Sequence, residues 1–352
     1  YDFYDFYLNN DYKGYYVLEE SFDNNLLIRN NRPVGPIFST FEEFNRTNLN
    51  SKKMFEVYDK KSWTNDESKL LITKETLEKI DNYLKGNLNF NDVFDIKKWA
   101  WFFAVTDLTY TYHGTMLKSV KFYYNPSTDK IEPIGYDGHR TLPNFSKYNE
   151  VSKFNKTNFT LAKENLEKKL YDRIFPIIQT GFFFNNEDLN YDFYEEYIKA
   201  IYNISSEEFL NKFFKDRKKK IKNINSGIYS DDYEFDKNSL IKSGIGIYYY
   251  DEQDIYIRAD NLRKKVHPNI DEIFIYINKN QLNIKNNNYN NFFLKDGKII
   301  CEKYDIPIAD LKIYKKELVV QVNDKFDNSC KKIVFNNSIN NKNYSINVNK
   351  YN

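Results

Sequence analysis

One stretch of the chain, residues 97–142, constrains the fold more than any other: KKWAWFFAVTDLTYTYHGTMLKSVKFYYNPSTDKIEPIGYDGHRTL. Its first part has the apolar character of a buried helix, a short polar loop follows, and two strands then surround an Asn-Pro-Ser-Thr turn. One aspartate, Asp107, lies near the end of the helix, and a second, Asp137, comes directly after the hairpin. The pattern therefore predicts a helix and a hairpin that carry two carboxylates on different elements.

The size and charge of the chain exclude some classes of protein. Its 352 residues are enough for one large domain and a smaller one, and its 31 Tyr and 29 Phe residues indicate cores filled mainly by rings. Because 52 basic residues nearly balance 50 acidic ones, the net charge of +2 gives no general attraction to nucleic acid or membranes. The sequence has no run of about 18 apolar residues, so we expect no transmembrane segment.

The first 60 residues have the pattern of a small sheet. Residues 1–8 and 12–19 alternate rings and aliphatic side chains around an Asn-Asn-Asp turn, which predicts a hairpin. A short helix within residues 19–31 and a strand at 37–41 should follow. The chain opens abruptly inside a strand, and we expect it to be a fragment whose amino-terminal part is missing.

The middle of the chain is predicted to be helical. Apolar spacing indicates helices at 66–85 and 91–109, the second capped by Asn91 or Asp92, with hairpin strands at 120–124 and 131–136. Ser206, followed by two glutamates, should begin a helix as its N-cap. The further helices are predicted at 161–175, 191–201 and 206–221.

From about residue 239 the pattern changes to short strands separated by Asn-rich turns, which predicts a β-rich region over residues 239–352. The strands are expected at 246–250, 272–278, 311–314 and 318–322. Cys301 and Cys330 have no metal-ligand spacing, and they are equally compatible with one disulfide or with two thiols.

The chemistry of phosphoryl transfer suits two carboxylates that meet across a cleft. One orients or deprotonates the acceptor hydroxyl, while the other holds Mg²⁺ against the phosphates. The 30 positions between Asp107 and Asp137 leave room for a loop and a complete hairpin, and Gly138 would let the backbone turn away from the metal. The structural alternatives are that Asp107 caps a turn and that Asp137 is an Asx-turn residue.

Four segments, taken in order, resemble the CotH-like family of atypical protein kinases, first described in spore coats. They are YLNNDYKGYYVLEE (7–20), NRPVGPIF (31–38), VFDIKKWAWFFAVTDL (93–108) and HGTMLKSVKFYYNPSTDKIEPIGYD (113–137). The resemblance covers about residues 1–220 and implies an α+β, protein-kinase-like bilobal domain over residues 1–238. Its small sheet lobe would span residues 1–60, its helical lobe with the hairpin residues 61–238, and the β-rich C-terminal region would follow.

The resemblance also implies an activity and its residues. A secreted or cell-envelope kinase would move the γ-phosphoryl group of ATP to Ser or Thr of a protein substrate, with Mg²⁺. Asp107 matches the catalytic aspartate and Asp137 the metal-binding aspartate. Glu19 and Glu20 match the acidic end of an early strand motif and are grouped with the nucleotide-binding candidates.

One departure from the family bears on activity. Relatives tend to carry Asn just before the hairpin, where this chain has Ser119, and a Ser hydroxyl is a weaker ligand for Mg²⁺ than an amide oxygen. The alternative is therefore a catalytically impaired pseudokinase or structural binding module of the envelope. A third reading is a phosphotransferase acting on a small molecule or polysaccharide.

Several further side chains are candidates around the same site. Arg140, Arg29 and Arg32 could clamp phosphate in bidentate fashion, although surface arginine is the commoner role. His113 and His139 flank the two aspartates and could position an acceptor or a phosphate, or simply make structural hydrogen bonds.

Overall fold

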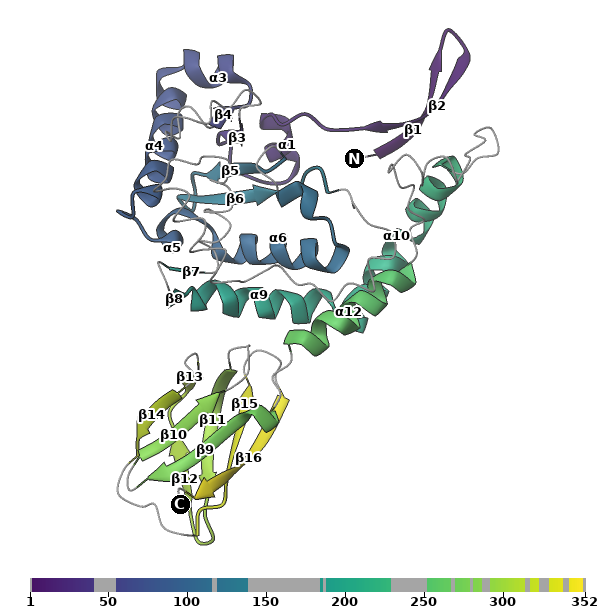
Figure 1. The fold of residues 1–352 in the computed structure, drawn as a ribbon. Coiled ribbons are helices and arrows are strands. Elements are labelled where there is room, and N and C mark those ends of the chain that lie inside the picture. Colours follow the sequence, from purple (N-terminus) through teal and green to yellow (C-terminus); the bar gives the residue numbers. More distant parts are fainter. Residues whose placement is uncertain are drawn as a thin grey trace, which may run out of the picture.

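The computed structural model describes residues 2–40, 55–115, 119–138, 184–185, 188–228, 252–266, 270–278, 281–286, 292–313, 317–322, 329–337 and 342–350. These residues form a mixed α+β fold, in agreement with the predicted class. A helical region with a small sheet leads into a strand-rich C-terminal region (Figure 1). Within the described ranges, no helix has both the length and the apolar character needed to cross a bilayer.

A four-stranded antiparallel sheet holds the predicted hairpin in the first region. Its strands lie in the order β4 (Phe55–Val57), β3 (Ile37–Thr40), β5 (Lys121–Asn125) and β6 (Lys130–Ile134). The turn between β5 and β6 closes because the Asn125 side-chain oxygen accepts a hydrogen bond from the backbone N–H of Ser127 at 3.0 Å. The hairpin prediction is confirmed.

The helix predicted for residues 91–109 is broken in two, which corrects both its start and its cap. The structure has α5 (Phe90–Val93), whose N-cap is Asn89, and α6 (Ile96–Thr109), whose N-cap is Asp95. Between them, Phe94 is extended and forms a β-bridge with Ile131 of β6. The side chain of Asp95 accepts from the N–H of Lys98 at 3.0 Å, and this bond starts the second helix.

Helix α4 (Glu67–Leu84) matches the helix predicted for residues 66–85. Asp66 caps it by accepting from the backbone N–H groups of Ser68 and Lys69, at 3.0 and 3.2 Å. Gly86, at φ +78°, follows the C-terminal end of the helix in the left-handed conformation that glycine adopts readily. The short helix α3 (Lys60–Asn65) precedes α4 and is an element that we did not predict.

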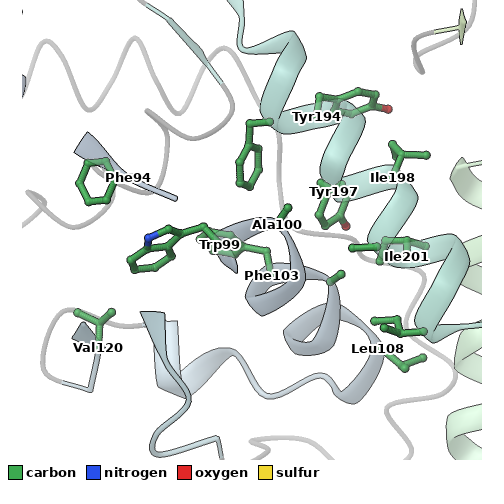
Figure 2. Packing of buried hydrophobic residues seen from close by; sticks show 14 of the residues in the cluster. Phe94, Trp99, Ala100, Phe103, Leu108, Val120, Tyr194, Tyr197, Ile198 and Ile201 are labelled. Atoms are coloured by element: carbon green, nitrogen blue, oxygen red, sulfur yellow. The ribbon is translucent and has the colours of Figure 1, made fainter. Parts of the chain in front are cut away.

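The larger hydrophobic core lies between α6 and the later helices α9 (Tyr191–Ile204), α10 (Glu207–Ile228) and α12 (Glu252–Val266). Rings from α6 and α9 meet between these two helices: Phe103 packs against Phe193 with ring centroids 6.1 Å apart, and Figure 2 shows Tyr197 on the side of α9 that faces α6. The indole N–H of Trp99 donates to the carbonyl oxygen of Ile131 at 3.0 Å and ties α6 to β6. The prediction that this helix is central and buried is confirmed.

The predicted helices at 191–201 and 206–221 are present as α9 and α10. Ser206 caps α10 by accepting from the backbone N–H of Phe209 at 3.2 Å, and Glu207 and Glu208 occupy the first turn, as predicted. The predicted helix at 161–175 and the predicted strand at 246–250 lie outside the described residues.

Helix α12 lies in the part of the chain for which the sequence predicted strands. Its buried residues Ile255, Ala259, Leu262 and Val266 belong to the core of the helical region. Arg263 donates to the carbonyl oxygen of Tyr202 on α9 at 2.8 Å. This helix is an element that the strand prediction missed, and it packs with the helices that precede it.

The N-terminal hairpin pairs β1 (Asp2–Leu8) with β2 (Asp11–Leu18) around Asn9 and Asn10, which both have positive φ, and confirms the prediction. Figure 1 shows it pointing away from the four-stranded sheet. It touches α10 where Lys220 forms an ion pair with Asp2 at 3.0 Å. Helix α1 (Asn24–Arg29) follows and is capped by Asp23. The first region also contains three short elements, η1 (Tyr112–Thr115), β7 (Phe184–Asn185) and β8 (Asp188–Leu189). A further short element, η3 (Ile270–Glu272), directly precedes the C-terminal sheet.

The C-terminal region is an eight-stranded sheet with its own core, and it confirms the strands predicted at 272–278, 311–314 and 318–322. The strand order is β12-β11-β15-β16-β9-β10-β14, with β13 paired to β11. Cys301 and Cys330 form a disulfide, which settles the alternative that the sequence left open. The strands are β9 (Ile273–Asn278), β10 (Gln281–Asn286), β11 (Phe292–Ile300), β12 (Asp305–Ile308), β13 (Leu311–Ile313), β14 (Glu317–Gln321), β15 (Lys332–Asn337) and β16 (Lys342–Lys350).

Candidate functional site

Asp107, the predicted catalytic carboxylate, is completely buried, with 0% of its surface exposed. It lies in the last turns of α6, and its carboxylate accepts a hydrogen bond from the hydroxyl of Tyr197 on α9. Its backbone carbonyl accepts from Nε of Arg258 on α12 at 2.9 Å. Asp107 therefore joins three helices in the interior.

The helix end explains this orientation. Helix α6 stops at Tyr110, which has left-handed backbone angles, and the consecutive residues Thr106, Asp107 and Leu108 are all buried, so the end of the helix is enclosed on more than one side. The guanidinium of Arg258 also lies over the ring of Tyr110, 5.5 Å from its centroid. Sequence reasoning missed Tyr197 and Arg258 as partners because both lie far along the chain.

Asp137, the predicted metal ligand, lies three residues after the end of β6 and is half-buried. Its φ of 50° is in the left-handed region, which Asp tolerates better than most residues. The hydroxyl of Ser119 donates to its Oδ2 at 2.7 Å, and Ser119 is 2% exposed. The two residues predicted to hold a metal are thus brought together, and they bond to each other.

The loop after α6 lies directly against the segment that carries Asp137. A Cβ atom at Gly114 would overlap the carbonyl oxygen of Tyr136, so only glycine fits there. A Cβ at Gly138 would lie 3.5 Å from Cβ of Thr111. The loop after α6 thus lies against the post-hairpin segment, while the carboxylate of Asp107 bonds to Tyr197 and that of Asp137 to Ser119.

A ring of aromatic side chains lies beside Asp137, and sequence reasoning did not foresee it. Phe22 packs against Tyr58 and Tyr136, with ring centroids 5.0 and 5.2 Å away. The ammonium of Lys121 lies 5.0 Å from the ring centroid of Tyr136 and 5.7 Å from that of Tyr58. Burial, and then the negative charges of Glu19 and Asp137, raise the pKa of Tyr136. The only signal in the sequence was a lysine between Val120 and Phe122 in a strand that is otherwise apolar.

The predicted phosphate clamps on the first 40 residues already have carboxylate partners. Nε of Arg29 lies 3.1 Å from Glu20, which pairs two candidates with each other. A guanidinium nitrogen of Arg32 lies 2.9 Å from the buried carboxylate of Glu132, which also accepts from the amide of Asn125 at 2.8 Å. Glu19 is exposed near Tyr136. In this arrangement Arg29 and Arg32 stabilise the fold around α1 and β6.

The remaining candidates are only partly covered by the structure. The backbone of His113 lies in η1, between α6 and the hairpin, whereas His139 and Arg140 lie outside the described residues. The described part of the chain contains no cluster of three or more His, Cys, Asp or Glu side chains able to hold a metal.

The donor set beside the hairpin fits Mg²⁺ in part. This ion commonly takes one or two protein carboxylates and completes its octahedron with water and substrate phosphates. Asp137 fits such a carboxylate, and Ser119 could add its hydroxyl oxygen once its proton no longer bonds to Asp137. Asp107 does not fit a base that meets a substrate, because its carboxylate lies inside the core.

A groove lies on the surface of the C-terminal sheet, across β11, β15 and β16. Its volume is about 690 Å³, and polar and amide side chains form much of its lining. They include Lys295, Asp296, Lys298, Asn336, Asn343 and Ser345. This groove offers hydrogen-bond donors and acceptors to a polar ligand, and it lies apart from the hairpin site in the other region of the molecule.

Fold and site together define an α+β protein with a buried structural aspartate and one partly accessible aspartate presented after a hairpin. No protein-family model matches the chain, and no curated protein is significantly similar to it in sequence.

Proposed function

We propose that this chain is a catalytically impaired, kinase-like scaffold that serves as a binding module of the cell envelope. The observation that carries the proposal is the burial of Asp107, whose carboxylate bonds to Tyr197 inside the core. The resemblance to CotH-like kinases is the reason to propose a kinase-like scaffold. The buried position of the Asp107 carboxylate is the reason to propose that this scaffold does not transfer a phosphoryl group.

Phosphoryl transfer to a hydroxyl requires a carboxylate within hydrogen-bond reach of the acceptor. To act in this way, Asp107 would have to leave the Tyr197 hydroxyl behind in the core. Leaving a buried donor without its acceptor costs about 1–3 kcal/mol. The helix would also have to rotate, although its backbone at Asp107 is bonded to Arg258.

The site around Asp137 supports binding. Asp137 is half-buried rather than enclosed, it accepts a hydrogen bond from the hydroxyl of Ser119, and it directly follows Tyr136, whose ring contacts the ammonium of Lys121. Bound Mg²⁺ would supply a positive charge there to hold phosphate oxygens, with Asp137 as its protein ligand. The polar groove of the C-terminal sheet gives the same molecule a second surface for a polymer or protein.

The disulfide supports an envelope setting. Disulfides persist mainly in oxidising compartments outside the cytoplasm. Cys301 and Cys330 form such a bond within the C-terminal sheet. A secreted or envelope-attached module would keep this bond in its working environment.

An active Ser/Thr protein kinase is the second candidate, and one observation favours it. The close approach of Gly114 to Tyr136 brings the helix-end loop against Asp137, which is the juxtaposition that a kinase-type site requires. Under this candidate, ATP and Mg²⁺ would be the cofactors, and a Ser- or Thr-containing envelope protein the substrate.

One experiment separates the two candidates. The chain is incubated with Mg²⁺ and γ-labelled ATP, with and without a Ser-rich protein acceptor, and its melting temperature is measured in parallel. We expect Mg²⁺-ATP to raise the melting temperature of the wild type, without transfer of label, and Asp137→Asn to lose the shift. Asp305→Asn is the matched control, because Asp305 is an exposed aspartate of β12 that lies outside both the hairpin site and the groove.

Label transfer by the wild type that disappears in Asp137→Asn would overturn the proposal in favour of the kinase. Label that appears only in Ser119→Asn would show a recoverable enzyme and would support impairment. No melting shift with Mg²⁺-ATP, together with no label, would exclude this ligand and leave the binding proposal without support at the hairpin site.

A further inference from the structure

Lys121 is a buried cation on the central strand of the hairpin site. Only 7% of its surface is exposed, and it lies on β5 opposite Ser39 of β3 and Ile134 of β6. Its ammonium group contacts the ring faces of Tyr136 and Tyr58 at 5.0 and 5.7 Å from their centroids. A charge in such a position is costly unless it is paired.

Three other cations among the described residues of the same region have oxygen partners. Arg32 pairs with Glu132, Arg258 donates to the carbonyl oxygen of Asp107, and Lys130 donates to the carbonyl oxygens of Asn91 and Asp92. Among the described residues, no oxygen lies within hydrogen-bond or ion-pair distance of the Lys121 ammonium. Within the part of the chain that the structure describes, these three cations have oxygen partners, whereas Lys121 contacts ring faces.

Ring faces do not replace an oxygen acceptor. A ring attracts a cation through its quadrupole, but an ammonium group has three N–H donors that seek lone pairs. Two rings on its sides thus fix the direction of the ammonium while leaving its hydrogen-bonding capacity for another group. Such an arrangement is preorganised for an incoming anion, since little side-chain entropy is lost on binding.

We propose that Lys121 is an anion-binding residue and that the module's ligand carries a compact oxyanion, a carboxylate or phosphate group, that docks on it. This inference rests on the proposed binding function and names the chemistry of its ligand. Tyr58 and Tyr136 position the ammonium, while Asp137, held by Ser119, lies on the neighbouring segment.

The test uses the full chain and three probes: inorganic phosphate, citrate and acetate, without Mg²⁺, at an ionic strength held constant with sodium chloride. Binding is measured by calorimetry and by the shift in melting temperature. We expect saturable binding of at least one probe by the wild type, and the probe that binds distinguishes a phosphate from a carboxylate. Lys121→Met should weaken binding by about tenfold or more, and Lys121→Arg by much less, because the charge-assisted hydrogen bond is lost only in the first.

Lys98→Met is the matched control, since Lys98 is an exposed lysine on α6 and its loss removes the same charge. It should bind as the wild type does. Equal binding by Lys121→Met and the wild type, or no binding of any probe by the wild type, would overturn the proposal.

The stability of Lys121→Met without any probe gives an independent decision. If Lys121 awaits an external anion, its replacement by an apolar side chain of similar length should leave the melting temperature unchanged or raise it. A lower melting temperature, or a failure to fold, would show that the contacts with Tyr58 and Tyr136 are structural, and would refute the proposal.

The result does not depend on the outcome of the phosphate-transfer assay. Asp137→Asn should retain binding of the metal-free probes, because the ammonium of Lys121 is untouched. Transfer of label by the wild type, together with probe binding that Lys121→Met loses, would refute the binding-module function and keep the anion site. If the wild type binds neither Mg²⁺-ATP nor any of the anion probes, both the binding-module function and the anion site are refuted.

Discussion

The two regions of the molecule build their cores from different side chains. Rings dominate the core of the helical region, including Phe38, Phe90, Trp99, Phe103, Phe193 and Tyr197. The core of the C-terminal sheet is mainly aliphatic and contains Ile275, Leu282, Ile284, Ile299, Ile313 and Ile333, together with the disulfide. Some rings of the first core also carry hydrogen-bonding atoms. Because of these atoms, the helical region can bind other polar groups in its interior.

Tyrosine and tryptophan add hydrogen-bonding atoms to an apolar interior. The indole of Trp99 bonds to β6, and the hydroxyl of Tyr197 bonds to Asp107. Isoleucine and leucine side chains provide no such bonds, and the C-terminal sheet, whose core also contains the stacked rings of Phe335 and Tyr344, is in addition cross-linked by a disulfide. The helical region therefore holds the charged group of Asp107 in its interior, whereas the polar groove of the C-terminal sheet lies on its surface.

The largest expected effect on stability comes from removing the ring of Trp99 in the first core. Trp99→Ala should lower the free energy of unfolding of the helical region by about 3–5 kcal/mol, because it leaves a cavity and removes the bond to Ile131. Urea denaturation followed by tryptophan fluorescence measures this, since Trp63, Trp99 and Trp101 all lie in the helical region. Trp101→Ala, at a site on the same helix that is 38% exposed, is the control and should cost far less.

Removal of the disulfide should weaken only the other region. The bond spans 29 positions, and replacing both Cys301 and Cys330 by Ala should cost about 3 kcal/mol through the greater freedom of the unfolded chain. Hydrogen exchange of the strands measures this loss. Tryptophan fluorescence should report an unchanged helical region, and a coupled loss in both regions would contradict the comparison.

Loss of the hydrogen bond between Tyr197 and Asp107 should have a smaller effect on stability. Tyr197→Phe removes the hydroxyl that donates to the buried carboxylate, and we expect a loss of about 1–3 kcal/mol in the free energy of unfolding. A double-mutant cycle with Asp107→Asn isolates the interaction of the pair. Additive effects of the two substitutions would show that the bond contributes nothing to stability.

The smallest expected effect is at the contact between the regions. Lys312 of β13 lies 3.2 Å from Glu195 of α9. Burial raises the pKa of Glu195, but hydrogen bonds and charges from Lys199 and Lys312 outweigh it, so the pKa lies below its ordinary value of 4.5. A lowered pKa means that the stabilisation is present above the unfolded-state value and is lost as pH falls through the folded-state value.

The stabilisation from Glu195 should amount to less than about 1 kcal/mol, because Lys312 is half-exposed. Melting curves across the acid range test it: Glu195→Gln should flatten the pH dependence. Glu196→Gln is the control, since Glu196 pairs with Lys199. Equal pH profiles for Glu195→Gln and the wild type would show that the ion pairs of Glu195 do not contribute measurably to stability.

Elements with strong local signals could be predicted from the sequence. The helix at α4 had regular apolar spacing and a capping aspartate, and the hairpin of β5 and β6 had alternation around a turn with Asn125. The break before α6 depends on the bridge between Phe94 and Ile131, which no local pattern encodes. Helix α12 had a readable signal, because Ile255, Ala259, Leu262 and Val266 repeat at helical spacing.

The candidate site was less predictable than the fold. The neighbourhood of Ser119 and Asp137 follows from the hairpin itself, so the sequence could bring these residues together. The burial of Asp107 depends on Tyr197 and Arg258, which lie 90 and 151 positions away. The partners of Arg32 and the ring faces around Lys121 likewise arise only from tertiary packing.

The bond from Arg258 to the carbonyl oxygen of Asp107 has a consequence for synthesis of the chain. Arg258 is made 151 residues after Asp107, which at ordinary rates of translation is about 8–30 seconds later. Until α12 has left the ribosome, the faces of α6 and α9 that receive it stay in contact with water. The helical region therefore reaches its native state late in synthesis, and nascent chains that stop before α12 should depend on chaperones.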